Sequence, residues 1–279
     1  KCESNVRPVV VGFGPAGMFA ALLLAIAGLN PLVLERGEDA ASRHEKVQRF
    51  FETGQLDTKS NVQFGEGGAG TFSDGKLNTL VKEKAFRNRK VLETFVQMGA
   101  DASILYVNKP HIGTDVLKNV IQNMRKEIIR LGGEFRFQSK LTDFETEQGK
   151  VTSITINKTE KINTNVLVLA IGHSARDTFS LIKQKNITMI PKPFAVGFRV
   201  EHPQTLINEA RYGNNAHRLG AADYKVTIKS NYLPKTDDII ASFTFFIASA
   251  SALAIASIAL ALPSASSNCD SFKPSALLI

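Results

Sequence analysis

The sequence predicts an α/β fold built on a parallel sheet, and three observations carry this prediction. Residues 9–11 are three consecutive valines, a β-branched run without alternation that is typical of a strand buried on both faces. An apolar helical stretch, residues 18–27, follows a glycine-rich turn at 12–17, and a second short apolar run, residues 32–34, follows that helix. A third buried run spans residues 166–171 and closes on Gly172.

Composition excludes several classes of protein. The 279 residues are 43% hydrophobic and 22% charged, ordinary values that rule out a disordered, collagen-like or coiled-coil chain. Cys2 and Cys269 lie at opposite ends, which leaves no disulfide framework, Cys-x-x-Cys redox pair or zinc site, and this cysteine usage predicts a reducing cytoplasm. The net charge of +8 does not identify a ligand, and nucleic acid is not predicted as a partner.

The strongest motif lies between the first two apolar runs. Residues 12–17 read Gly-Phe-Gly-Pro-Ala-Gly, which fits the G-x-G-x-x-G pattern, and Glu35 ends the next run 23 residues after Gly12. Gly12 permits a tight turn, Gly14 lets backbone N–H groups approach a pyrophosphate, and Gly17 lets the helix pack on the strand. The helix N-terminus adds partial positive charge. The segment therefore predicts a βαβ dinucleotide site, in which Glu35 favours FAD or NAD over NADP.

A second glycine cluster, residues 65–71, follows a polar stretch, residues 40–51, that we expect to be helical. Four glycines in six residues are too many for a regular element. Two interpretations stay open on chemistry alone: a loop whose backbone approaches a phosphate or flavin ring, or a surface turn without a ligand.

Long stretches of the chain resemble the bacterial FAD-dependent dehydrogenases, also called NAD(P)/FAD-dependent oxidoreductases, which have the glutathione-reductase-type FAD-binding fold. The resemblance extends over about residues 6–225 and is carried by residues 11–37, 60–79, 109–115, 172–178, 192–197 and 201–203. It implies that the first glycine turn and Glu35 hold the ADP half of FAD, and that residues 67–71 lie along the pyrophosphate and flavin. The residues expected to contact the cofactor are Gly12, Gly14, Pro15, Ala16, Gly17, Glu35, Arg36, Gly67, Gly68, Ala69, Gly70, Thr71, Leu141 and Gly172.

The middle of the chain supports this fold from its own pattern. Apolar residues recur at helical spacing from Leu117 to Leu131, Thr114 or Asp115 is the expected cap, and a glycine pair at 132–133 ends the helix. Phe135 and Phe137 alternate as in a strand. Residues 141–144 and 151–156 predict a small antiparallel excursion with its turn at 147–150. Ordinary core packing is the alternative role for Leu141 and Gly172.

Three domains follow. Residues 1–180 form a Rossmann-like FAD-binding domain with an excursion at about 140–160, and residues 181–232 form part of a β-rich substrate or cap domain. Residues 233–279 form an Ala/Ser-rich hydrophobic tail unrelated to the family, for which an interrupted or frame-shifted gene is the simplest account. Within it, the uncharged stretch Ile239 to Leu262 is long enough to cross a membrane but lacks edge aromatics, so a span is not favoured.

The leading functional hypothesis is an FAD-dependent oxidoreductase that passes hydride or electrons between a small-molecule substrate and bound flavin, with NAD(P)H as an additional candidate donor. A non-catalytic dinucleotide-binding remnant or scaffold is the alternative, and a membrane-tethered flavoprotein is a third. The five histidines are scattered, no metal site is expected, and no catalytic residue can be assigned. The chain begins with Lys1 and has no signal-peptide pattern, which favours a fragment of a cytoplasmic protein.

Overall fold

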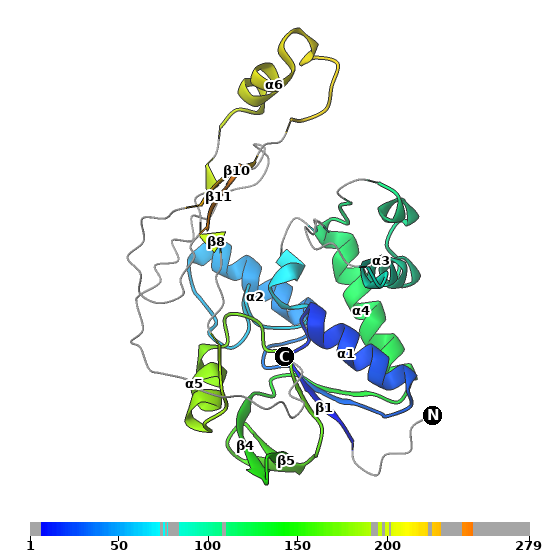
Figure 1. Cartoon of the computed structure of the whole chain (residues 1–279), viewed down its shortest axis with the longest axis vertical. Coiled ribbons are helices and arrows are strands. Elements are labelled where there is room, and N and C mark those ends of the chain that lie inside the picture. Colours follow the sequence, from blue (N-terminus) through cyan, green and yellow to red (C-terminus); the bar gives the residue numbers. More distant parts are fainter. Residues whose placement is uncertain are drawn as a thin grey trace. The chain divides into compact units, whose positions relative to one another are not determined.

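A computed structural model of the chain divides into two compact units (Figure 1). The described residues up to Ile187 belong to one unit, and those from Thr188 onward belong to the other. The residues that the structure describes are 7–72, 75, 77, 84–107, 110–190, 195–196, 199–200, 202–222, 225–229 and 242–247.

The first unit contains the predicted parallel sheet. Its strands are β1 (Val9–Val11), β2 (Leu32–Leu34), β3 (Glu134–Arg136) and β7 (Leu167–Leu169), arranged in the order β3-β2-β1-β7. All three pairings are parallel. β1 and β2 are buried along their whole length, as their unbroken apolar runs predicted.

Seven helical segments accompany this sheet in the described part of the first unit: α1 (Pro15–Ile26), α2 (Ala40–Thr53), η1 (Gly68–Phe72), α3 (Arg87–Gln97), η2 (Ala102–Leu105), α4 (Thr114–Arg130) and α5 (Arg176–Gln184). α1 and α4 lie side by side (Figure 1). The expected cap of α4 is wrong: Gly113 occupies the N-cap without a side-chain hydrogen bond, and Thr114 already lies inside the helix. The second glycine cluster was expected to lack regular structure, whereas Gly68–Phe72 is a 3₁₀ turn, short enough to tolerate its glycines.

The predicted antiparallel excursion is confirmed and has a third strand. β4 (Leu141–Glu147) pairs with β5 (Lys150–Ile156), which pairs with β6 (Glu160–Asn163). Gln148 and Gly149 both have positive φ, 51° and 76°, as a two-residue hairpin turn requires.

The parallel sheet separates two apolar cores. Val10 and Val33 point into the first, with α1 and α4, while Val9 and Val11 point into the second. That second core contains Phe144 from β4, with other residues of the antiparallel sheet and α5. The sheet is therefore covered by helices on one face and by the antiparallel sheet with α5 on the other, which leaves its carboxyl edge for the loops that follow each strand.

The second unit has a separate sheet. Its elements are β8 (Ala195–Val196), β9 (Arg199–Val200), α6 (Gln204–Tyr212), η3 (Gly213–Asn215), β10 (Lys225–Lys229) and β11 (Ser242–Ile247). β11 pairs antiparallel with β10 and parallel with β8 and β9. The apolar stretch at 239–262 was considered as a spanning helix, but its described part, residues 242–247, is a strand, and the rest lies outside the described residues. Among the helices that the structure describes, none has the length and apolarity to span a membrane.

Candidate functional site

Two glycine-rich segments that are distant in sequence lie against each other at the carboxyl end of β1. The first is the turn 12–17, and the second is 65–71. The Gly67 N–H donates to the Phe13 carbonyl across 2.8 Å. A Cβ built on Gly14 would lie 3.7 Å from the Gly68 Cα. The structure therefore brings together both groups of glycines that the sequence singled out.

Packing within the chain explains some of these glycines. Gly12 has a φ of +97°, and a Cβ there would collide with the Ala170 carbonyl. A Cβ on Gly17 would collide with the Gly12 carbonyl, so this close approach of helix and strand admits only glycine. Gly12 and Gly17 thus serve the turn and the helix–strand contact assigned to them from the motif.

Gly14 and Gly70 differ from those two. Neither has a left-handed backbone, and a Cβ on each would make only ordinary contacts, at 3.7 Å to Gly68 and 3.9 Å to Pro15. The chain's own packing therefore does not require glycine at either position. Their bare backbone instead leaves room where a ligand's phosphate could approach, so the segments fit a dinucleotide.

The N-terminus of α1 adds favourable electrostatics to this edge. Gly14 is the N-cap, Pro15 occupies the first turn, and the cap makes no side-chain hydrogen bond. Pro15 and Ala16 are exposed, and the first turn has no acidic residue. The first turn of α1 itself thus places no carboxylate against the partial positive charge of the helix N-terminus, which suits an anionic group.

Glu35 is buried, with 4% of its surface exposed, and its carboxylate joins three loops. Oε2 accepts from the Phe13 N–H at 2.9 Å, while Oε1 accepts from the N–H groups of Gly37 at 2.9 Å and Gly65 at 3.0 Å. A carboxylate offers about four acceptor positions. The three backbone bonds, which the sequence did not predict, leave one acceptor position of Oε2 for the expected hydrogen bond to a ribose.

Arg36 points toward α5. Its guanidinium makes two hydrogen bonds to Asp177, at 3.0 and 3.1 Å, and stacks over the Phe64 ring at 3.9 Å. Lys140 also pairs with Asp177. Partial burial raises the pKa of Asp177, but hydrogen bonds from Arg36 and Lys140 outweigh it and hold that pKa well below its ordinary value. Arg36 therefore ties the end of β2 to α5.

The remaining predicted contacts lie at the same sheet edge or next to it. Leu141 opens β4 and is buried in the second apolar core. Just before it, the Ser139 N–H donates to the Glu35 carbonyl at 2.9 Å. Gly172 follows β7 with a φ of +70°, and a Cβ there would have nothing within 4 Å.

Sequence reasoning missed two charged residues of this site, Arg43 and Glu66. Both have 0% exposure. Burial lowers the pKa of Arg43 to about 10, opposed by the charges of Glu35 and Glu66, so the guanidinium stays protonated at neutral pH. The buried face of α2 comprises Ala40, Arg43 and Val47, and an arginine at helical spacing between two apolar residues was the available signal.

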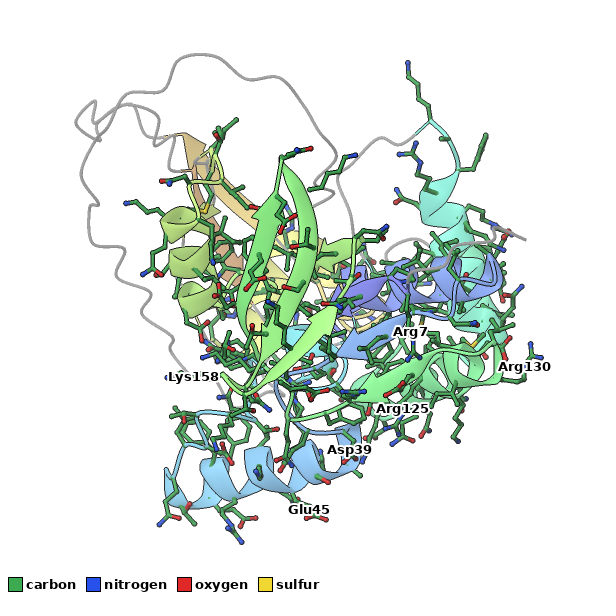
Figure 2. The ribbon with its side chains drawn as sticks, turned by 90° about the horizontal axis from the view of Figure 1, so that it is seen from below. Arg7, Asp39, Glu45, Arg125, Arg130 and Lys158 are labelled. Atoms are coloured by element: carbon green, nitrogen blue, oxygen red, sulfur yellow. The ribbon has the colours of Figure 1, made fainter. Side chains whose placement is uncertain are left out.

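Glu66 connects the second glycine segment to two helices. Its Oε2 accepts from the Ala40 N–H of α2 at 2.7 Å, and Oε1 lies 3.2 Å from Nε of Arg125 on α4. Burial raises the pKa of Glu66, against the lowering effect of the Ala40 hydrogen bond and the Arg125 charge. Figure 2 places Asp39, the N-cap of α2, and Arg125 in this region of the first unit.

In the part of the chain that the structure describes, no group of three histidine, cysteine or acidic residues is arranged to hold a metal.

Comparison with known proteins identifies similar sequences. Residues 193–245 match the family model of the FAD-dependent protein, C-terminal domain-like. The match therefore includes residues 233–245, the beginning of the segment that we expected to be a tail unrelated to the family. An uncharacterized protein of Clostridium beijerinckii (strain ATCC 51743 / NCIMB 8052) is 52% identical over 235 residues, 84% of this chain. The chain spans 44% of that relative's length.

Solved structures give weaker likenesses. THI4 of Thermovibrio ammonificans has 12% identity and a TM-score of 0.44, over 86% of this chain and 76% of that one. The FAD-bound form of OTEMO has 15% identity and a TM-score of 0.36, over 61% of this chain and 26% of that one. The L-amino acid deaminase from Proteus vulgaris has 18% identity and a TM-score of 0.34, over 69% and 52%. Likeness at this level does not indicate what this chain binds.

Proposed function

We propose that the first unit binds FAD and that the chain is part of an FAD-dependent oxidoreductase acting on a small molecule, with a binding site of the glutathione-reductase type. The contact between the two glycine segments at the N-terminus of α1, with space at Gly14 and Gly70, is the observation that carries the proposal. The match of residues 193–245 to a domain of FAD-dependent proteins supports the identity of the cofactor.

The chain's own residues divide the binding task. The first glycine turn and the α1 N-terminus would receive the diphosphate, and Gly67 to Thr71 would lie along it. Glu35 would hold the ribose of the adenosine, and its carboxylate would disfavour a 2′-phosphate there. Arg36, Leu141 and Gly172 would border the adenosine and the late strand. Bound flavin would supply the hydride or electron transfer, while these residues bind and orient it.

The absorbance spectrum of the purified full chain, with and without added FAD, tests this function. We expect a flavin spectrum that dithionite bleaches, and release of FAD on heating. Reduction by NADH or NADPH would assign the electron donor. Bound FAD that dithionite reduces but that neither NADH, NADPH nor any of a panel of small-molecule substrates reduces would favour a non-catalytic dinucleotide-binding role. Failure to hold flavin even with excess FAD would overturn the proposal.

Glycine-to-alanine variants locate the site. Gly14→Ala and Gly70→Ala place a methyl group where the protein has room, so each should fold like the parent but bind FAD about tenfold or more weakly. Gly220→Ala is the matched control, because its φ is not left-handed either and a Cβ there meets nothing within 4 Å, so it also tolerates a methyl group. Equal FAD affinity in all three variants would show that the diphosphate does not bind at these two segments.

A further inference from the structure

Arg43 lies at the centre of the contact between α2 and the second glycine segment. Its buried guanidinium donates to backbone or hydroxyl oxygens of five residues of the segment 61–71. Nε donates to the carbonyl of Asn61 at 2.8 Å, Nη2 to that of Val62 at 2.9 Å, and Nη1 to the carbonyls of Gly65 at 3.2 Å and Glu66 at 2.6 Å and to Oγ1 of Thr71 at 3.4 Å. The Phe72 ring lies 4.7 Å from Cζ of the guanidinium. One side chain thus fixes the direction of four backbone carbonyl groups.

The peptide between Glu66 and Gly67 transmits this constraint to the first glycine turn. Its carbonyl accepts from Arg43, and its N–H donates to the carbonyl of Phe13 at 2.8 Å. Because the C=O and N–H of a trans peptide point in opposite directions, fixing one end aims the other. Arg43 therefore acts, through a single planar peptide, on the separation between Gly68 and Gly14.

The same segment is held at its neighbouring peptides. The Gly65 N–H donates to Glu35, and the Glu66 N–H donates to the Glu38 carbonyl at 2.9 Å. Gly65 also packs directly on the arginine, since a Cβ there would collide with the side chain of Arg43. After Gly67, whose backbone is left-handed with a φ of +86°, the Gly68 N–H donates to the Gly65 carbonyl at 2.9 Å, so hydrogen bonds hold the chain on both sides of Gly67.

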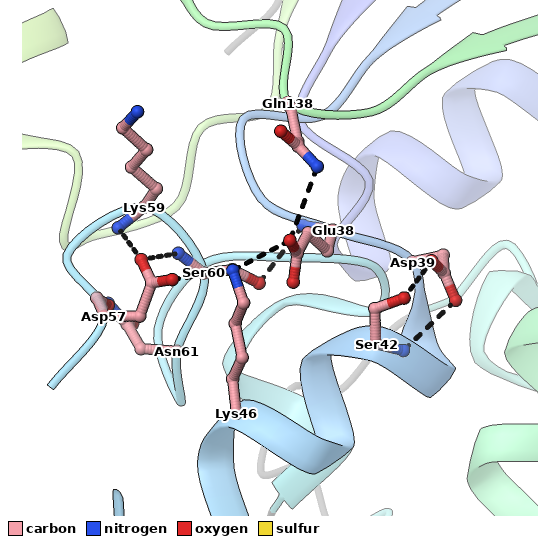
Figure 3. A network of polar contacts seen from close by, with 9 residues as sticks. All are labelled: Glu38, Asp39, Ser42, Lys46, Asp57, Lys59, Ser60, Asn61 and Gln138. Carbon is pink, nitrogen blue, oxygen red and sulfur yellow. Dashed lines mark hydrogen bonds and ion pairs between the residues drawn. The ribbon is translucent and has the colours of Figure 1, made fainter. Parts of the chain in front are cut away.

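A second contact from α2 holds the residues just before this segment (Figure 3). Lys46, one turn after Arg43, forms ion pairs with Glu38 at 2.8 Å and Asp57 at 2.6 Å. Asp57 in turn accepts from the N–H groups of Lys59 and Ser60. These pairs are only partly buried and contribute less than groups that are fully desolvated, so the buried arginine is the principal constraint.

We propose that Arg43 is a positioning residue that sets the shape of the second glycine segment against the first and thereby sets the affinity for the dinucleotide. The inference rests on the proposed function for its ligand. Lysine cannot replace Arg43, because one ammonium offers three donors from a single point, whereas these carbonyls are reached by a planar fork. A preformed segment also avoids the entropy cost of ordering its glycines when the ligand binds.

Arg43→Lys in the full chain tests the proposal, with Arg49→Lys as the matched control because Arg49 is exposed on the same helix. FAD affinity is measured by titration, and backbone amide hydrogen exchange is measured without FAD. We expect Arg43→Lys to weaken FAD binding about tenfold. We also expect exchange to accelerate at the amides of Gly65, Gly67 and Gly68 but not in β1 or β2. Arg49→Lys should leave both readouts as in the parent.

The outcomes separate positioning from a merely structural role. A folded Arg43→Lys with parental affinity and parental exchange at these amides would overturn the proposal, as would acceleration spread equally over β1 and β2. If Arg43→Lys does not fold, Glu66→Gln decides: it keeps an acceptor for the Ala40 N–H but removes a negative charge beside Arg43. Accelerated exchange confined to the glycine segment supports the proposal, and unchanged exchange rejects it. If the parent chain binds no FAD, the proposed function fails. The exchange data would still test whether Arg43 holds the second glycine segment in place.

Discussion

Replacing Glu35 with glutamine is expected to destabilise the first unit substantially. The carboxylate accepts three backbone N–H groups, from Phe13, Gly37 and Gly65, and it is buried. A glutamine amide has one acceptor oxygen and one NH₂ group in place of two acceptors. If its oxygen takes the place of Oε1, it keeps the bonds from Gly37 and Gly65, and its NH₂ then faces the N–H of Phe13.

The magnitude follows from these contacts. A buried donor left without an acceptor costs roughly 1–3 kcal/mol, and hydrogen bonds to a charged group contribute about 1.5–3 kcal/mol each, more than neutral ones. One unsatisfied N–H and two weakened bonds together predict a loss of about 3 kcal/mol in the free energy of unfolding.

Urea unfolding at pH 7, followed by circular dichroism without added cofactor, measures this loss. Glu45→Gln is the control, because Glu45 is exposed on α2 (Figure 2), and it should shift the free energy of unfolding by no more than about 0.5 kcal/mol. The dependence on urea should keep its slope, so that the midpoint alone reports stability. A Glu35→Gln variant as stable as the control would refute the assignment of Glu35 as the acceptor that joins the three loops.

Two further predictions concern stability. Because the pKa of Asp177 is held low in the folded chain, its pairs with Arg36 and Lys140 stabilise fully above its ordinary pKa of 3.8 and are lost as the pH falls through the lower, folded value. Asp177→Asn should therefore cost about 0.5–1 kcal/mol at pH 7, since the pair is partly exposed, and should flatten the unfolding free energy measured between about pH 5 and 2; a curve parallel to the parent's would contradict this. Gly17→Ala forces a methyl group onto the Gly12 carbonyl and should lower the free energy of unfolding by about 2 kcal/mol or more, and a melting temperature equal to the parent's would contradict that contact.

Much of the fold could be predicted because buried strands and helices have characteristic patterns of apolar residues in the sequence. β1 is apolar at every position since both of its faces meet a core, and α4 repeats its apolar residues at helical spacing for the same reason. The residues that cap helices were harder to predict from the sequence. Thr114 is a favoured cap residue, but Gly113 takes that position, because capping depends on the path of the chain before the helix.

The candidate site was predictable where the motif fixes a backbone geometry. Gly12, Gly17 and the end of β2 occupy the places that the spacing assigned to them. Arg43 could not be assigned, because its partners are backbone carbonyls, and every residue carries one. Only the folded path of residues 61–66 shows which of these oxygens converge on it.

Glycine itself shows why a motif underdetermines its site. Gly17 and Gly14 stand in the same six-residue pattern, yet a methyl group on Gly17 would strike the chain, whereas one on Gly14 would not. Gly17 is required by folding and would be retained even if no ligand bound. Packing does not require glycine at position 14. Because glycine loses more conformational entropy than alanine on folding, Gly14 disfavours the folded state. Under the proposed function, the close approach of a ligand accounts for glycine at a position where the chain bears that cost although a methyl group would fit, and Gly70 meets the same condition on the opposite segment.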